Sequence, residues 1–148
     1  MKGRLVLWVD TNVIVYFLRT NKDFSPSVRE LVRQAETGRF LLKISPLVIA
    51  ECAFVLMGPQ FRRTKTQIVE VLTAFGRLKG VEMADRSNVE CALARFAEPG
   101  IDFTDAYLAE LAKADPACGI VSVDIRHMSR LGADAKTPRD WLADVDGT

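Results

Sequence analysis

Four acidic residues are spaced so that an α/β fold could bring them into one hydrolytic site: Asp10, Glu51, Asp105 and Asp124. Asp10 and Asp124 each follow an apolar run, and the carboxyl ends of parallel strands carry the ligand sites of open α/β sheets. Clustered carboxylates repel one another, and a divalent cation relieves that repulsion. Hard carboxylate oxygens without histidine or thiolate suit Mg²⁺ or Mn²⁺. Water on such an ion can be activated, so the pattern predicts phosphodiester hydrolysis.

Each of these acids also has a purely structural interpretation. Asp10 and Asp124 could cap the helices that follow them, and Asp102 with Asp105 has the spacing of a helix cap and its third-residue partner. We interpret Asp102 as a cap. Glu51 could reach solvent or pair with an arginine, although its apolar neighbours make a solvent-facing position hard to maintain. All four structural interpretations together require several independent coincidences, which favours the metal site.

The first half of the chain predicts strands that alternate with helices. The run 5–9 is typical of a strand buried on both faces, and a helix over about 11–18 follows it. The second strand is expected at 40–44. Helices are predicted to begin at Ser25-Pro26, where Ser27 and Glu30 have capping-box spacing, at Ser45-Pro46, and at Thr64, whose capping-box partner is Gln67.

The second half continues the alternation. A short strand is expected at 81–84, a helix from 85 or 87 to about 97, and a helix from Asp102. Residues 119–123 predict a second buried strand. A short helical piece and an edge strand near Ala135 follow, with Trp141 and Leu142 docking the tail. We therefore expect one α/β domain over residues 1–148, with a mostly parallel sheet covered on both faces.

Composition excludes several other classes. The chain has 148 residues and a net charge of +1, so no global field indicates a polyanionic partner. Three widely spaced cysteines favour a reducing, cytoplasmic compartment; we expect Cys52 and Cys91 to be buried. One histidine, His127, cannot build a zinc site with them. No signal peptide or apolar run of membrane-spanning length is evident.

A basic segment in mid-chain is the candidate RNA-facing surface. Arg62, Arg63 and Lys65 follow Phe61 and the Gly58-Pro59 turn. Basic side chains bind phosphates, and an adjacent aromatic ring can stack on an unpaired base. A solvated charged face is the structural alternative for this segment.

The acidic motifs, taken in order, resemble those of PIN-domain ribonucleases, and the small single-domain form resembles VapC-type toxins of bacterial toxin–antitoxin pairs. The residues that carry this resemblance are Asp10-Thr11-Asn12-Val13, residues 45–51, residues 102–106 and Ser122-Val123-Asp124. The resemblance covers nearly the whole chain. The first motif alone is weak, but the four in this order and at these separations are specific.

The resemblance implies a three-layer α/β/α fold and a Mg²⁺- or Mn²⁺-dependent endoribonuclease. It implies that Asp10 and Asp105 are metal ligands and that Glu51 and Asp124 complete the catalytic set. The implied partners are the RNA substrate, a second copy of the chain in a homodimer, and an antitoxin protein that blocks the site. The resemblance also implies that three further residues donate hydrogen bonds that hold these carboxylates: Thr11, Asn12 and Ser122.

Two departures from the family pattern and two alternatives complete the interpretation. His127 stands where phenylalanine is common, and Ser122 stands where threonine is common; neither removes a carboxylate. A non-catalytic or housekeeping RNA-binding or RNA-processing module of the same fold is one alternative. A haloacid-dehalogenase-type phosphatase is the other, but its chemistry needs a second aspartate where this chain has Asn12.

Overall fold

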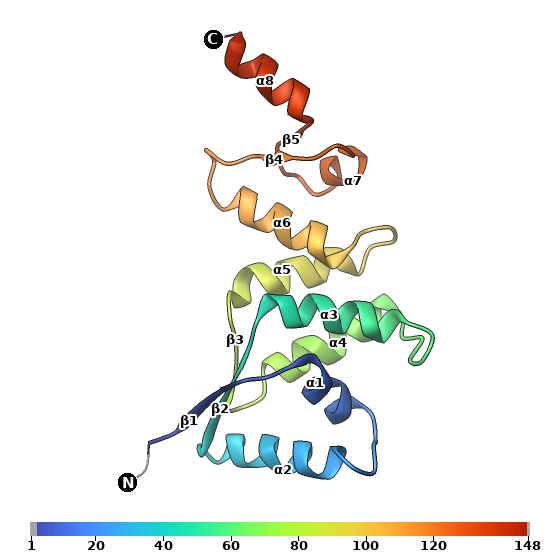
Figure 1. The fold of residues 1–148 in the computed structure, drawn as a ribbon, viewed down its shortest axis with the longest axis vertical. Coiled ribbons are helices and arrows are strands. Elements are labelled where there is room, and N and C mark those ends of the chain that lie inside the picture. Colours follow the sequence, from blue (N-terminus) through green and yellow to red (C-terminus); the bar gives the residue numbers. More distant parts are fainter. Residues whose placement is uncertain (1–2, 148) are drawn as a thin grey trace. The chain divides into compact units, whose positions relative to one another are not determined.

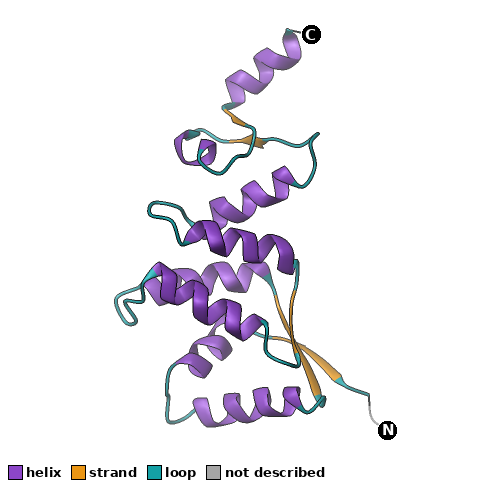
Figure 2. Cartoon of the chain, turned by 180° about the vertical axis from the view of Figure 1, so that it is seen from behind, coloured by secondary structure: helices purple, strands orange, loops and turns teal. Residues whose placement is uncertain are grey.

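The computed structural model describes residues 3–147, and the chain divides into two compact units, residues 1–86 and 87–148. Each unit has its own parallel sheet, with three strands in the first and two in the second (Figures 1 and 2). The predicted α/β class with parallel strands is therefore confirmed. The expectation that residues 1–148 form one domain stays a prediction.

The first unit is built on the strand order β1-β2-β3. The strands are β1 (Leu5–Trp8), β2 (Phe40–Ile44) and β3 (Val81–Met83), and the helices are α1 (Thr11–Leu18), α2 (Ser25–Glu36), α3 (Pro46–Met57) and α4 (Lys65–Gly76). The central strand β2 carries the buried side chains Leu42 and Ile44. Helix α2 packs against β2 and α4 packs against β3, while α1 contacts both α2 and α3. Helix α1 follows β1 and helix α3 follows β2, and these two strands are neighbours in the sheet. The amino ends of both helices therefore follow the carboxyl ends of adjacent strands.

The prediction of a first strand buried on both faces is wrong for the described unit. Leu5, Val6 and Trp8 are each more than half exposed. The physical reason is strand order, because β1 lies at the edge of the three-stranded sheet and pairs only with β2 there. An apolar run predicts a strand but does not say whether that strand is central. Lys43 covers part of β1 by placing its ammonium 4.8 Å from the centre of the Trp8 ring.

All three predicted helix starts in this unit are confirmed, including Ser25-Pro26 for α2. Ser45 caps α3 by accepting a hydrogen bond from the Leu47 amide, and Thr64 with Gln67 forms a complete capping box on α4. The proposed Ser27–Glu30 capping box is wrong, because α2 already begins at Ser25 and the Ser27 hydroxyl instead donates to the Phe24 carbonyl. Proline in the first turn needs no amide hydrogen bond, which favours the earlier start.

The second unit contains helices and a short sheet. Its elements are α5 (Arg86–Phe96), which begins at the boundary, α6 (Phe103–Lys113), β4 (Ile120–Val121), α7 (Arg126–Ser129), β5 (Ala135–Lys136) and α8 (Pro138–Asp146). Strands β4 and β5 pair in parallel, with Ile120 opposite Ala135. The indole nitrogen of Trp141 donates to the Ile120 carbonyl at 2.8 Å, which docks α8 on this sheet as expected for Trp141.

Several predictions for the second unit need correction. The buried strand expected at 119–123 is only two residues long, and Val121 and Val123 are largely exposed. Leu142 is also exposed, so it does not dock the tail. Helix α8 was not predicted, although Thr137-Pro138 with Asp140 carries a capping signal that the structure uses.

The cysteines are all free thiols. Cys52 is buried as expected, but Cys91 is exposed, because it lies on α5 away from the buried face formed by Val89, Ala92 and Phe96. No helix in the described part of the chain is both long and apolar enough to span a membrane.

Candidate active site

Asp10 stands between β1 and α1. It is the N-cap of α1, and its Oδ1 accepts a hydrogen bond of 2.7 Å from the Thr11 amide. A negative charge at this position also complements the positive end of the helix dipole. The residue is nevertheless exposed, and Oδ1 carries the one capping bond. The cap therefore orients the carboxylate without removing it from solvent.

Glu51 and Asp10 both act electrostatically on the same buried thiol, that of Cys52. Burial, and after it the negative charges of Glu51 and Asp10, raise the pKa of Cys52 to about 12. The Thr11 side chain lies beside this thiol and lowers its pKa slightly, although its buried hydroxyl has no hydrogen bond of normal geometry. The first unit therefore brings Asp10 and Glu51 together around Cys52.

The expectation that Glu51 is kept from solvent is wrong. Glu51 is exposed, whereas the next two residues along α3, Cys52 and Ala53, are buried. Leu47 and Phe54, which lie one turn to either side of Glu51, are also exposed. Residues three and four apart share a helix face, so α3 presents an outer face with one carboxylate among apolar side chains. Apolar sequence neighbours of Glu51 lie on the opposite face.

Asp105 lies near other acidic side chains of the second unit. It lies in the first turn of α6 and is partly buried. Burial raises the pKa of Asp105, the Asp102 and Asp124 carboxylates raise it further, and the opposing charge of His127 lowers it. Asp102 holds the N-cap position but makes no capping hydrogen bond through its side chain. The second unit therefore brings three carboxylates into one negative neighbourhood.

Asp124 is held by its neighbours in the loop before α7. Its Oδ1 accepts hydrogen bonds from the Arg126 amide and the Arg126 guanidinium, both at 3.3 Å, and these lower the pKa of Asp124. The Ser122 hydroxyl bonds the backbone amide and carbonyl of Asp124 rather than its carboxylate. Ser122 thus fixes the loop, and Arg126 is the side chain that contacts the acid.

The structure places the four predicted acids as two pairs, one in each unit. Asp10 and Glu51 belong to the first unit, and Asp105 and Asp124 belong to the second. Among the described residues, neither unit by itself contains three histidine, cysteine, aspartate or glutamate side chains arranged to bind one metal ion. Of the predicted supporting donors, Thr11 supplies its backbone amide to Asp10, whereas Asn12 has no such hydrogen bond and lines a cavity described below.

All four acids lie within one region of the chain that matches a known protein family. The sequence profile of the PIN domain matches residues 7–132, a range that contains all four carboxylates and most of both units. The chain belongs to the PIN domain family. A search among curated proteins gave no match to the chain. This PIN domain therefore has a nuclease-type fold, and PIN domain nucleases typically use divalent metal ions.

The donor set of this PIN domain fits a hard divalent cation. The acids of each pair offer oxygen ligands; the charge of His127 opposes the negative charge around Asp105, and Arg126 bonds Asp124. Oxygen ligands with excess negative charge are what Mg²⁺ and Mn²⁺ prefer.

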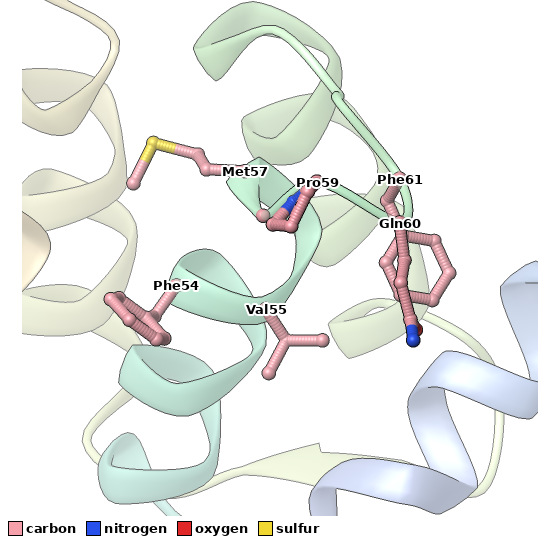
Figure 3. Close-up of a pocket in the computed structure, with 7 residues that line it drawn as sticks. Phe54, Val55, Met57, Pro59, Gln60 and Phe61 are labelled. Atoms are coloured by element: carbon pink, nitrogen blue, oxygen red, sulfur yellow. The ribbon is translucent and has the colours of Figure 1, made fainter.

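The basic segment of the PIN domain forms the loop between α3 and α4 and the start of α4. Arg62 has a φ of 47° there, and the Arg63 amide donates to the Leu56 carbonyl. Both arginine side chains are exposed, and Lys65 opens α4. A cavity of about 450 Å³ lies where this loop leaves α3, lined by residues 54, 55 and 57–61. Figure 3 shows Phe54 and Met57 pointing away from Gln60 and Phe61.

Sequence reasoning missed two features of this site. Arg126 contacts Asp124 and was not singled out, although a basic residue two positions after a candidate acid is a visible signal. Asp102 holds the N-cap position as predicted but makes no capping hydrogen bond through its side chain, and its charge also raises the pKa of Asp105. The same capping spacing fits both functions, so sequence alone does not separate them.

Proposed function

We propose that this PIN domain is a Mg²⁺- or Mn²⁺-dependent endoribonuclease that hydrolyses RNA phosphodiesters. The observation that carries the proposal is that acids occupy all four motif positions inside the matched range, at Asp10, Glu51, Asp105 and Asp124. Each acid is either exposed or only partly buried, so each can reach a ligand from solvent. The charge environment of Asp105 also supports binding of a cation.

The four acids have distinct functions in this proposal. Asp10 and Asp105 hold the ion directly, and the capping bond from Thr11 fixes the orientation of Asp10. Glu51 and Asp124 complete the set by binding a second ion or by orienting the attacking water. Arg126 holds Asp124 in its ionised form. We propose that both pairs serve the same reaction, which makes activity sensitive to loss of any one of them.

The reaction is a hydrolysis in which water attacks phosphorus and the 3′-oxygen leaves. The bound ion, when present, supplies an activated water and stabilises the negative charge that builds on the phosphoryl oxygens. Glu51 or Asp124 accepts the proton of the attacking water as it adds to phosphorus. The departing oxygen takes up a proton from solvent, which gives a 3′-hydroxyl and a 5′-phosphate.

The product ends test this reaction. The ribose 2′-hydroxyl takes no part, so an RNA with a single 2′-deoxy residue at the cleavage position should be cut at a similar rate. Mass spectrometry of the fragments should show 5′-phosphates. Cyclic phosphate ends, or loss of cleavage at the deoxy position, would contradict the proposed chemistry.

We further propose that the chain is the toxin of a VapC-like toxin–antitoxin pair that acts in the cytoplasm. The small size of the chain and its motif resemblance support this use, and its three free cysteines suit a reducing compartment. A homodimer and a cognate antitoxin are part of the proposal, and the exposed side chains Leu47 and Phe54 on α3 offer apolar surface for a partner. Growth arrest on expression, relieved by co-expression of a small neighbouring gene, would test the toxin function, and light scattering would test the dimer.

A further inference from the structure

A second cavity of the first unit lies along α1, directly after the proposed ligand Asp10. Its volume is about 220 Å³. Its wall includes polar and aromatic side chains from α1, from the turn after it and from the loop after α3: Asn12, Tyr16, Arg19, Asn21, Gln60 and Phe61.

The spacing of the α1 residues explains why they share one wall. Asn12 and Tyr16 are four residues apart on α1, which places them on one face of the helix, and Arg19 is the C-cap residue that directly follows the helix. Helix α1 contacts α3, and the loop that follows α3 brings Phe61 over this face. The Arg19 guanidinium lies 5.2 Å from the centre of the Phe61 ring. The cavity therefore extends along α1 from a position two residues after Asp10.

The wall carries a cation and unused hydrogen-bonding groups. Within residues 3–147, Arg19 forms no ion pair, and the side-chain amides of Asn12 and Gln60 form no hydrogen bond with the protein. Asn21 uses its Oδ1 to accept from the Asp23 and Phe24 amides, which leaves its amino group available. No aspartate or glutamate lines the cavity. Such a site favours a ligand that is flat, rich in hydrogen-bonding edges and negatively charged.

A single nucleotide of RNA has this combination of properties. Unpaired bases stack on aromatic rings and on arginine guanidinium planes, and their edges bond to amide side chains. Arginine also binds phosphate with charge-assisted hydrogen bonds. Arg62 and Arg63 follow Phe61 immediately, so the same loop offers cations for the neighbouring phosphates.

We propose that this cavity binds one nucleotide of the RNA substrate, with its base against Phe61 and Arg19 and its edge bonded to Asn12 and Gln60. The inference rests on the proposed ribonuclease function and adds base recognition to it. Phe61 and Arg19 supply affinity, whereas Gln60 supplies preference among bases, because an amide distinguishes hydrogen-bond donors from acceptors.

Binding by an inactive variant separates base recognition from general attraction to phosphate. The probe is a fluorescein-labelled random-sequence RNA of twelve nucleotides, compared with an abasic ribose–phosphate chain of the same length, each bound to the Asp10→Asn protein with Mg²⁺. Adding Phe61→Ala should weaken RNA binding on the order of tenfold and leave abasic binding unchanged. Phe61→Leu keeps apolar volume without the ring and should behave like Phe61→Ala.

Matched variants complete the test. Arg19→Gln should weaken RNA binding more than Arg39→Gln, which removes an equal charge at the amino end of β2. Gln60→Ala should change the order of affinity for the four homopolymeric RNAs. The inference is wrong if Arg19→Gln and both Phe61 variants bind RNA as well as Arg39→Gln does. It is also wrong if these variants weaken binding of the abasic chain as much as binding of RNA. In both cases the ribonuclease proposal stands. If the Asp10→Asn protein binds neither probe, the base-recognition inference is wrong, and cleavage of RNA by the wild-type protein decides the ribonuclease proposal separately.

Discussion

At the scale of single residues, Asp10 has a structural function, as a helix cap, that is compatible with the metal binding proposed for it. Its Oδ1 bonds the Thr11 amide at the start of α1, and the residue stays exposed. Sequence analysis considered the cap and the metal ligand as alternatives, but the geometry allows both at once. Asparagine caps helices about as well as aspartate but lacks the charge that a divalent cation needs. The two functions can therefore be separated by mutation.

Asp10→Asn should remove metal binding without loss of folding. We expect its free energy of unfolding in EDTA to stay within about 0.5 kcal/mol of the wild-type value, whereas Asp10→Ala should cost about 1 kcal/mol through loss of the cap. Millimolar Mg²⁺ should raise the melting temperature of the wild-type protein by mass action and leave that of Asp10→Asn unchanged. Equal stabilisation of both proteins by Mg²⁺ would exclude Asp10 as a ligand.

The three cysteines should differ sharply in reactivity. Cys52 is buried with a pKa of about 12, so it has almost no thiolate at pH 8. Cys91 and Cys118 are exposed, but the Asp115 carboxylate raises the pKa of Cys118. We expect iodoacetamide to label Cys91 first, Cys118 more slowly and Cys52 only after unfolding. Mass spectrometry of timed samples measures this order, and early labelling of Cys52 would contradict its burial.

At the scale of elements, the signals that predicted correctly are local ones. The Thr64–Gln67 capping box and the Ser45 cap depend on residues within one turn, so sequence spacing was sufficient to identify them. The exposure of β1 depends on which strand pairs with it, and that information is not local to the run 5–9. The exposure of Glu51 likewise depends on which face of the largely apolar α3 is covered.

The capping box of α4 should contribute measurably to stability. Thr64 Oγ1 accepts from the Gln67 amide at 3.1 Å, and the Gln67 side chain accepts from the Thr64 amide at 3.0 Å. Thr64→Ala should lower the free energy of unfolding by about 1 kcal/mol. The control Thr66→Ala, exposed in the same turn, should be neutral or slightly stabilising because alanine favours helix. Urea denaturation measures both, and equal effects would contradict the capping contribution.

The loop between α3 and α4 should bind RNA phosphates. Arg62 and Arg63 are exposed there, next to the Phe61 ring. Changing both to alanine should weaken binding of single-stranded RNA and lower the slope of log affinity against log salt by about 1.4, the value for two phosphate contacts. Fluorescence anisotropy at several salt concentrations measures the slope. An unchanged slope would show that these arginines do not contact the substrate.

At the scale of the whole molecule, the sequence predicted the family and the acids but not how each acid is held. The match to residues 7–132 spans both compact units, and each unit holds one pair of the proposed catalytic carboxylates. Motif order reveals which acids belong to the family pattern. The bonding of Asp124 to Arg126 and the action of Asp102 on Asp105 depend on side-chain positions that only the fold provides.

Cleavage of RNA is the most direct test of the proposed activity. Purified protein would be incubated with a mixed pool of cellular RNA in Mg²⁺, Mn²⁺ or EDTA, beside Asp10→Asn and the control Asp23→Asn, which removes an exposed acid in the turn before α2. We predict discrete fragments with either metal, none with EDTA, and loss of cleavage in Asp10→Asn but not in Asp23→Asn. Intact RNA with a folded, metal-loaded protein, or equal cleavage by wild type and Asp10→Asn, would contradict the account.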